Sequence, residues 1–151
     1  MVVLPTVPFG VNTGQLGIKQ CLNRNPSTQA ALLRDLVSEL EGQGIWKLVI
    51  INGHGGNDFR QMIRELQPHT KMFVCALNWW TCVDPKSYFD DPGDHAGELE
   101  TSVMQHIAPE RVLPLSDAGD GKQKRASIAA MRGGGVWATR PGPRWSAATG
   151  P

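Results

Sequence analysis

Two short apolar segments, separated by a stretch long enough for one helix, constrain the fold more than any other feature of this sequence. WKLVII (residues 46–51) and KMFVCALNWW (71–80) each have the pattern of a strand that is buried on both faces of a sheet. NDFRQMIRELQ (57–67) lies between them, is followed by Pro68, and is predicted to form a helix. Two strands joined by a helix of this length form a βαβ unit, in which the strands are parallel. The sequence therefore predicts an α/β fold.

Further elements flank this unit. Residues 25–44 predict an earlier helix, capped by Ser27 or Thr28 and ended by glycines. Its apolar residues fall on one face at helical spacing: Leu32, Leu33, Leu36, Val37 and Leu40. Residues 97–107 predict a third helix that is closed by a proline. Residues 2–10, which contain two prolines, are expected to form a short edge strand.

Length and composition bound the class of protein. A chain of 151 residues has the length of one domain, so a single domain over residues 1–151 is expected. The net charge of +1 gives no indication of nucleic acid or an anionic membrane as a partner. No apolar run approaches the roughly 18 residues of a membrane span, and residues 1–10 do not resemble a signal peptide. Three cysteines without a CxxC pair argue against a disulfide framework. We therefore expect a cytoplasmic protein.

Residues 132–151 form a tail that is rich in glycine and proline and has no periodicity. This composition is typical of a flexible segment. Trp137 and Trp145 argue against that interpretation, because disordered segments are usually poor in aromatic residues. Both interpretations stay open.

His54 lies in a glycine-rich turn, GHGGN, directly after the first predicted strand. Ligands of open α/β sheets bind beyond the carboxyl ends of the strands, which is where this turn falls. The N-terminus of the following helix would point its N–H groups to the same place. His54 is therefore a candidate metal ligand. Two alternatives are a tight turn with an incidental histidine and a phosphate-binding turn, although the stretch lacks a Walker lysine and does not match GxGxxG.

GDHAGELETS (93–102) crowds ionisable side chains into the start of the third predicted helix. His95 and Glu98 are three residues apart, which places them on one side of a helical turn, where they can address one ion or one substrate. Carboxylates in a first turn also stabilise a helix through its dipole. For Glu100 we prefer this simpler explanation.

Histidine and carboxylate side chains together suit zinc or manganese. A catalytic zinc site keeps one position open for water, and the metal lowers the pKa of that water to about 7. His95 or an acidic neighbour can then pass a proton to a leaving nitrogen, which is the chemistry of amide hydrolysis. Trp79 and Trp80, at the end of the second predicted strand, either fill the core or form a wall of a small-molecule pocket.

NGHGGN and HAGELETS, in this order and at this separation, resemble the creatininase (creatinine amidohydrolase) family. LPTVPFGVNTGQL, NPSTQ and AGDG resemble further stretches of that family, so the likeness covers most of the chain. The resemblance implies a three-layer α/β/α fold with a mostly parallel sheet, an oligomeric assembly, and a two-metal centre that activates water against C–N bonds. Implied substrates are cyclic amides such as creatinine and formamides on pyrimidine intermediates, and other members process peptides during cofactor maturation.

The resemblance also implies roles for individual residues. His54 and Glu98 correspond to metal ligands, with zinc expected and manganese as the alternative. His95 corresponds to the residue that moves protons beside the metals. Trp79 and Trp80 would lie near the substrate.

The sequence departs from the pattern of the family in two places. Gly56 stands where creatinine-hydrolysing members tend to have an acidic residue, which argues against creatinine as the substrate. Residues 1–26 contain no Glu, Asp or His, although members of the family normally carry further ligands in an N-terminal segment. We therefore expect this chain to correspond to the middle and C-terminal part of a family member, incomplete at its N-terminus. The missing ligands would come from a segment before Met1 or from a partner chain.

Two hypotheses follow from these observations. The first is a metal-dependent amidohydrolase that acts on a small-molecule amide and forms a homo-oligomer. The second is a non-catalytic relative that binds a small ligand or serves as an oligomerising module.

Overall fold

The computed structural model describes the chain except residues 14–15, 17–18, 94–95, 118–123, 126–136 and 139–151. The chain divides into two compact units, Met1–Trp79 and Trp80–Pro151. The expectation of a single domain over residues 1–151 stays a prediction.

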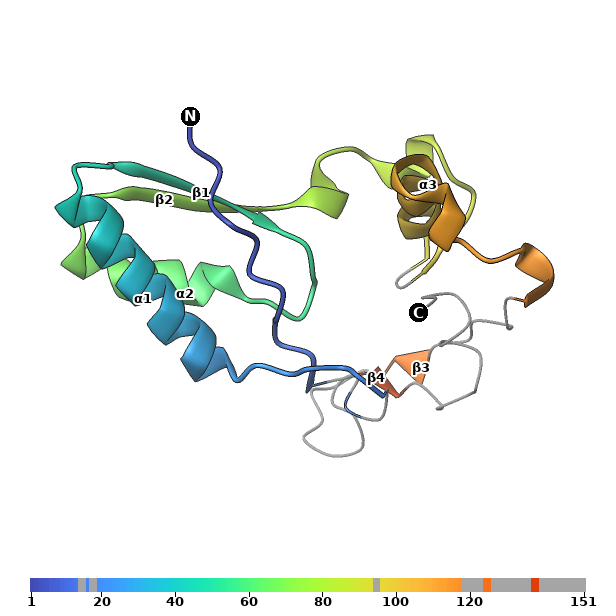
Figure 1. The fold of residues 1–151 in the computed structure, drawn as a ribbon, viewed down its shortest axis with the longest axis horizontal. Coiled ribbons are helices and arrows are strands. Elements are labelled where there is room, and N and C mark those ends of the chain that lie inside the picture. The colour runs from blue at the N-terminus through green and yellow to red at the C-terminus, as the bar shows by residue number, and fades with distance from the viewer. Residues whose placement is uncertain (14–15, 17–18, 94–95, 118–123, 126–136, 139–151) are drawn as a thin grey trace. The chain divides into compact units, whose positions relative to one another are not determined.

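The first unit contains the βαβ arrangement that the sequence predicts. Its regular elements are α1 (Pro26–Gly42), β1 (Lys47–Asn52), α2 (Phe59–Leu66), the short 3-10 helix η2 (Gln67–His69) and β2 (Phe73–Asn78). β1 and β2 pair in parallel from Lys47 opposite Phe73 to Asn52 opposite Asn78. The parallel α/β class is therefore confirmed, and Figure 1 shows α2, which connects the two strands in the sequence, on one side of the strand pair.

α1 begins one residue earlier than its predicted caps. Asn25 holds the N-cap position and Pro26 is the first helical residue, so Ser27 and Thr28 lie inside the first turn. The prediction of a Ser27 or Thr28 cap is wrong because proline, whose φ is already helical and which has no N–H to satisfy, takes the first position. The predicted end is confirmed at Gly42, and Gly44 then turns the chain with a φ of +77°.

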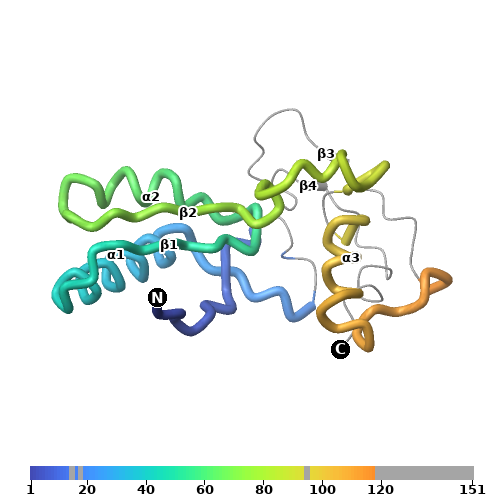
Figure 2. Tube along the Cα trace, turned by 90° about the horizontal axis from the view of Figure 1, so that it is seen from above, coloured from blue at the N-terminus to red at the C-terminus, as the bar shows by residue number. Residues whose placement is uncertain are grey.

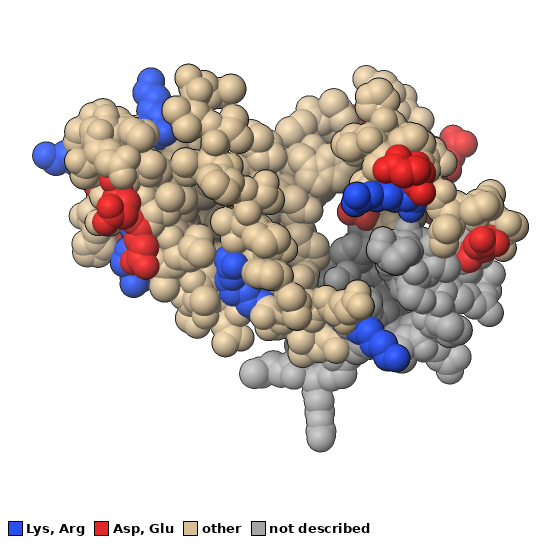
Figure 3. Space-filling view, viewed as in Figure 1, with Lys and Arg blue, Asp and Glu red and all other residues tan. Residues whose placement is uncertain are grey.

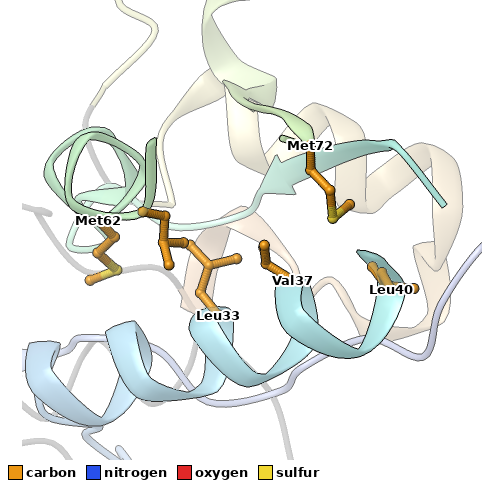
Figure 4. Close-up of a cluster of buried hydrophobic side chains, with 6 residues drawn as sticks. Leu33, Val37, Leu40, Met62 and Met72 are labelled. Carbon is orange, nitrogen blue, oxygen red and sulfur yellow. The ribbon is translucent and has the colours of Figure 1, made fainter. Parts of the chain in front are cut away.

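The core of the first unit lies between the two helices and one face of the sheet. α1 contributes three side chains from its predicted apolar face, and α2 and the approach to β2 contribute the other three (Figure 4). The six buried residues are Leu33, Val37, Leu40, Met62, Leu66 and Met72. Leu36 packs against this cluster, whereas Leu32 is 39% exposed and lies at the edge of the predicted stripe.

The opposite face of the two-stranded sheet is apolar and open. Figures 1 and 2 show α1 and α2 on the same side of β1 and β2. Side chains that point away from the helices are exposed, including Val49 at 54%, Ile51 at 72% and Phe73 at 60%. The prediction that both strands are buried on both faces is wrong for the described residues. A continuous apolar run satisfies either arrangement, because successive strand residues point to opposite faces.

Residues 2–10 were expected to form an edge strand, and they do not. The described segment makes only an isolated parallel bridge between Gly10 and Asn23. Pro5 and Pro8 lack the N–H groups that a strand ladder requires, which explains why pairing does not extend along the segment.

Glu41, in the last turn of α1, ties that helix to the segment that leads into β2. Its carboxylate accepts hydrogen bonds from the Thr70 hydroxyl (2.7 Å) and the Lys71 backbone N–H (2.9 Å). These two bonds, with a smaller contribution from the positive charge of Lys71, hold the pKa of Glu41 below its ordinary value.

Glu41→Gln is expected to lower the stability of the first unit at neutral pH. Because the folded-state pKa is lowered, the ionised carboxylate contributes stability above the pKa of the unfolded chain, and this contribution is lost as the pH falls through the folded pKa. Urea unfolding at a series of pH values should therefore show a deficit that shrinks in acid. Glu39→Gln, at an exposed position of the same helix, is the matched control, and equal deficits in the two variants would contradict the prediction.

The second unit contains the third predicted helix. α3 spans Glu98–Ile107, as expected, and is flanked by the short 3-10 helices η4 (Pro85–Ser87), η5 (Pro109–Arg111) and η6 (Leu115–Asp117). β3 (Lys124–Arg125) and β4 (Trp137–Ala138) form a short antiparallel pair. The rest of the predicted tail, 132–136 and 139–151, lies outside the described residues.

The hydropathy of the helices and the distribution of charge, over the part of the chain that the structure describes, both agree with the composition. Within the described residues, no helix is long and apolar enough to cross a membrane. On the face drawn in Figure 3, basic and acidic side chains of the described residues are scattered among uncharged ones. This distribution fits the near-neutral net charge of the chain.

Candidate active site at the carboxyl end of the first parallel strand

His54 lies in the turn between β1 and α2, at the position that the sequence predicts. The turn is closed by a hydrogen bond from the Asn57 N–H to the His54 carbonyl oxygen (3.1 Å). Nδ1 of His54 accepts a second hydrogen bond from the Gly56 N–H (3.2 Å). The half-buried imidazole is therefore held by the backbone of its own turn.

Asn52, the last residue of β1, fixes this turn to the sheet. It is 2% exposed, and its Nδ2 donates to Oδ1 of Asn78, its partner at the end of β2 (2.8 Å). Its own Oδ1 accepts from the His54 N–H (3.2 Å) and from Nδ2 of Asn57 (3.0 Å). Both hydrogen-bonding groups of this buried amide are thus used, as burial of a polar group requires.

Asn57 extends the same network to two other segments. Its Oδ1 accepts from the backbone N–H of Val11 (2.9 Å) and from Nε2 of Gln29 on α1, which is 4% exposed (2.9 Å). The carboxamide cluster, defined as Gln29, Asn52, Asn57 and Asn78, therefore joins α1, both strands, the His54 turn and the N-terminal segment.

The glycine at position 56 is required by close packing. A Cβ atom there would collide with the carbonyl oxygen of Val11 and would lie 2.8 Å from Cε1 of His54. A Cβ atom at Gly53 would meet nothing within 4 Å. The space around the turn therefore explains the glycine at position 56 but not the glycine at position 53.

The hydrogen bond at Nδ1 constrains how His54 can bind a metal. In a neutral ring with an accepting Nδ1, the proton resides on Nε2. A metal at Nδ1 would replace the Gly56 N–H. A metal at Nε2 would require the proton to move to Nδ1, which breaks that hydrogen bond.

Glu98 is the first residue of α3, in the second unit. Its exposed carboxylate accepts from the Asp91 N–H (3.2 Å) and so fastens the preceding loop to the helix. Glu100 accepts from the Ala96 N–H (2.6 Å), which supports the predicted capping role of that carboxylate. His95, the predicted proton-transfer residue, lies outside the described residues.

Trp79 and Trp80 form a 3-10 helix, η3 (Trp79–Thr81), directly after β2, and both are half-buried. Trp79 ends the first unit and Trp80 begins the second, so their predicted place near a substrate stays a prediction. His69 and His106, which lack candidate partners in the sequence, are exposed, as expected.

The described residues do not by themselves form a complete metal centre. Across them, no three His, Cys, Asp or Glu side chains come together as a group that could hold a metal ion. The backbone N–H of His54 donates to the carboxamide of Asn52, and amide oxygens are poor zinc ligands. The turn after β1 thus offers one imidazole, short of the three protein ligands of a catalytic zinc site.

Sequence reasoning found His54 and missed the carboxamide cluster. A signal was present, since the predicted strands end in VIIN and CALN, and parallel strands bring their carboxyl ends to the same edge. The asparagines at positions 52 and 78 could therefore have been paired. The contribution of Gln29 depends on the packing of α1 and has no comparable signal.

Comparisons with known proteins agree with this fold. The creatininase family, described as creatinine amidohydrolase, matches residues 1–150, and the chain belongs to this family. The chain is 33% identical over 144 residues to the mycofactocin precursor peptide peptidase of Mycobacterium ulcerans (strain Agy99), with 91% of this chain and 52% of that protein covered.

A crystal structure gives a second comparison. It is that of a Bacteroides fragilis NCTC 9343 protein assigned as a creatinine amidohydrolase, which is 46% identical with a TM-score of 0.73. The match covers 83% of this chain and 50% of that one. The creatininase-like α/β fold predicted from the sequence is therefore confirmed. The chain spans about half the length of the relatives that it matches.

Proposed function

We propose that the chain acts in a metal-dependent amidohydrolase that cleaves the C–N bond of a cyclic amide or a formamide with metal-activated water. Family membership supports an amidohydrolase. The single observation that carries the proposal is the buried side chain of Asn52, which accepts from the His54 N–H and so fixes the turn that presents this half-buried histidine at the carboxyl end of β1. Such support of a ligand by surrounding hydrogen bonds is typical of metal sites.

In this proposal His54 and Glu98 are metal ligands and His95 transfers the proton to the leaving nitrogen. Zinc is the proposed metal and manganese the alternative. When bound, such a metal supplies a water whose pKa is lowered to about 7. The chain contributes an imidazole held by the Gly56 N–H and by a turn anchored to Asn52.

The substrate is proposed from three observations. Gly56 lies where creatinine-hydrolysing relatives tend to have an acid, which favours a different cyclic amide or a formamide. Trp79 and Trp80 follow β2 and are proposed to contact the substrate. A peptide bond is a second candidate, favoured by the 33% identity to a peptide peptidase.

Metal content of the purified chain and of His54→Ala tests this proposal, with His69→Ala as the control at an exposed histidine. With an N-terminal segment that carries the missing ligands supplied, we expect bound zinc or manganese in the wild-type and His69→Ala proteins. Binding should be at least about 100-fold weaker in His54→Ala, since even supporting residues of a metal site contribute 10- to 100-fold. Hydrolysis of cyclic amides, formamides and short peptides should fall with the metal. Absence of metal and turnover from all three proteins would favour the non-catalytic alternative.

Self-association is a separate proposal, implied by the family and consistent with the open apolar face of β1 and β2. A mass that rises with concentration in sedimentation equilibrium is expected. A monomer at every concentration would contradict it.

A further inference from the structure

An open surface cavity of about 330 Å³ lies in the first unit beside the start of α1. It has both apolar and polar walls. Its lining residues are Phe9, Leu22, Asn23, Arg24, Asn25 and Thr28. No acidic side chain is among these lining residues, although one of them is a cation.

Arg24 brings a half-buried guanidinium to this cavity. Its Nη1 is buried and has no hydrogen-bond partner. The ion pair found among the described residues is between Arg111 and Glu110. Arg24 therefore has no carboxylate partner within the described part of the chain. An unpaired cationic donor is costly to bury, and a planar guanidinium matches the two oxygens of a carboxylate or phosphate.

The start of α1 adds to the positive potential at the cavity. The side chain of Asn25 makes no capping hydrogen bond, and the first turn of this 17-residue helix contains no acid. The positive end of the helix dipole is therefore not compensated by a side chain of the first turn. The orphan N–H groups of a first turn and the guanidinium both favour an anion.

The wall of the cavity is joined to the His54 turn through two adjacent residues. The backbone N–H of Arg24 donates to the carbonyl oxygen of Gly10 (2.8 Å). Val11, which follows Gly10 in the sequence, donates its backbone N–H to Oδ1 of Asn57 (2.9 Å). An anion at Arg24 would therefore lie beside the segment that packs against the turn of the candidate active site.

We propose that this cavity binds a small organic carboxylate, with the oxygens on Arg24 and the first turn of α1 and the apolar part on Phe9 and Leu22. The proposal does not depend on hydrolysis or on a metal. The apolar walls favour an organic carboxylate over inorganic phosphate, which has the same oxygen chemistry and no apolar part.

Calorimetric titration of the 151-residue chain with hexanoate, acetate and inorganic phosphate tests the proposal. We expect saturable binding of hexanoate, with weaker binding of the other two anions. Arg24→Met should weaken hexanoate binding by about tenfold or more, because a charge-assisted bidentate contact is lost. Arg34→Met, at an exposed position of α1 that does not line the cavity, should leave it unchanged.

Equal binding by the wild-type and Arg24→Met proteins, or absence of binding by the wild-type chain, would overturn the assignment. Arg24-dependent binding that is tightest for phosphate would overturn the choice of an organic carboxylate.

A second pair of variants keeps the test valid if Arg24→Met folds poorly. Thr28 lines the cavity and Ser27 does not, although both lie in the first turn of α1. Thr28→Glu should place a carboxylate in the cavity, raise the Tm and abolish hexanoate binding. Ser27→Glu should gain only the stabilisation that a negative charge gives to the N-terminus of a helix. It should still bind hexanoate. Loss of binding in both variants, or in neither, would contradict the proposed site.

Discussion

Replacing Gly56 with alanine is expected to lower the free energy of unfolding by about 3 kcal/mol, the upper end of the cost of overpacking a well-packed site. The added Cβ collides with the carbonyl oxygen of Val11, and a backbone atom cannot move aside as a flexible side chain can. It also lies 2.8 Å from Cε1 of His54, so the ring must shift from its hydrogen bond with the turn. Urea unfolding monitored by circular dichroism measures the loss.

Gly53→Ala is the matched control, since it adds the same methyl group to the same turn. Its Cβ meets nothing within 4 Å, so a change within about 0.5 kcal/mol is expected. Stability of Gly56→Ala equal to that of Gly53→Ala would show that the turn is not packed against Val11 as described.

Asn52→Asp is expected to destabilise the protein by about 2–4 kcal/mol at neutral pH. The substitution keeps the shape of the side chain, but a carboxylate cannot donate to Asn78, and it places a negative charge at a position that is 2% exposed. Burial raises the pKa of such a carboxyl, so the deficit relative to the wild type should shrink in acid, where the protonated group is neutral and regains a donor. Unfolding at neutral and acidic pH measures both effects.

Asn78→Asp is the corresponding control. Asn78 accepts the hydrogen bond from Asn52 and lies at an exposed position, so an aspartate there keeps an accepting oxygen at lower cost. A deficit as large as that of Asn52→Asp would mean that donation by Asn52 is not what the buried network requires.

The sequence predicts the order and direction of the main elements well, because these depend on local patterns. The apolar stripe of α1, the parallel pairing of β1 with β2, and α3 all follow from spacing and from the length of the intervening helix. The faces of the sheet do not follow from local patterns. Val49 and Ile51 are as apolar as Leu48 and Ile50, so only the position of the helices decides which pair is covered.

For the candidate site too, the sequence predicts the local features and not the contacts between distant segments. The glycine-rich turn and the end of a buried strand identify His54, whereas the hydrogen bonds of Gln29 and Asn57 depend on how distant segments pack. His54 and Glu98 belong to different units, so their role as joint metal ligands stays a prediction.

The pairing of Asn52 with Asn78 links assembly of the site to folding kinetics. These residues are 26 positions apart and are the last pair of the strand register. A slip by one residue would turn every following side chain to the other face and would separate the two amides. Parallel pairing across a helix-containing connection must first overcome the entropy of closing that loop, which slows folding. The anchor of the His54 turn therefore forms in the same step that joins the two strands.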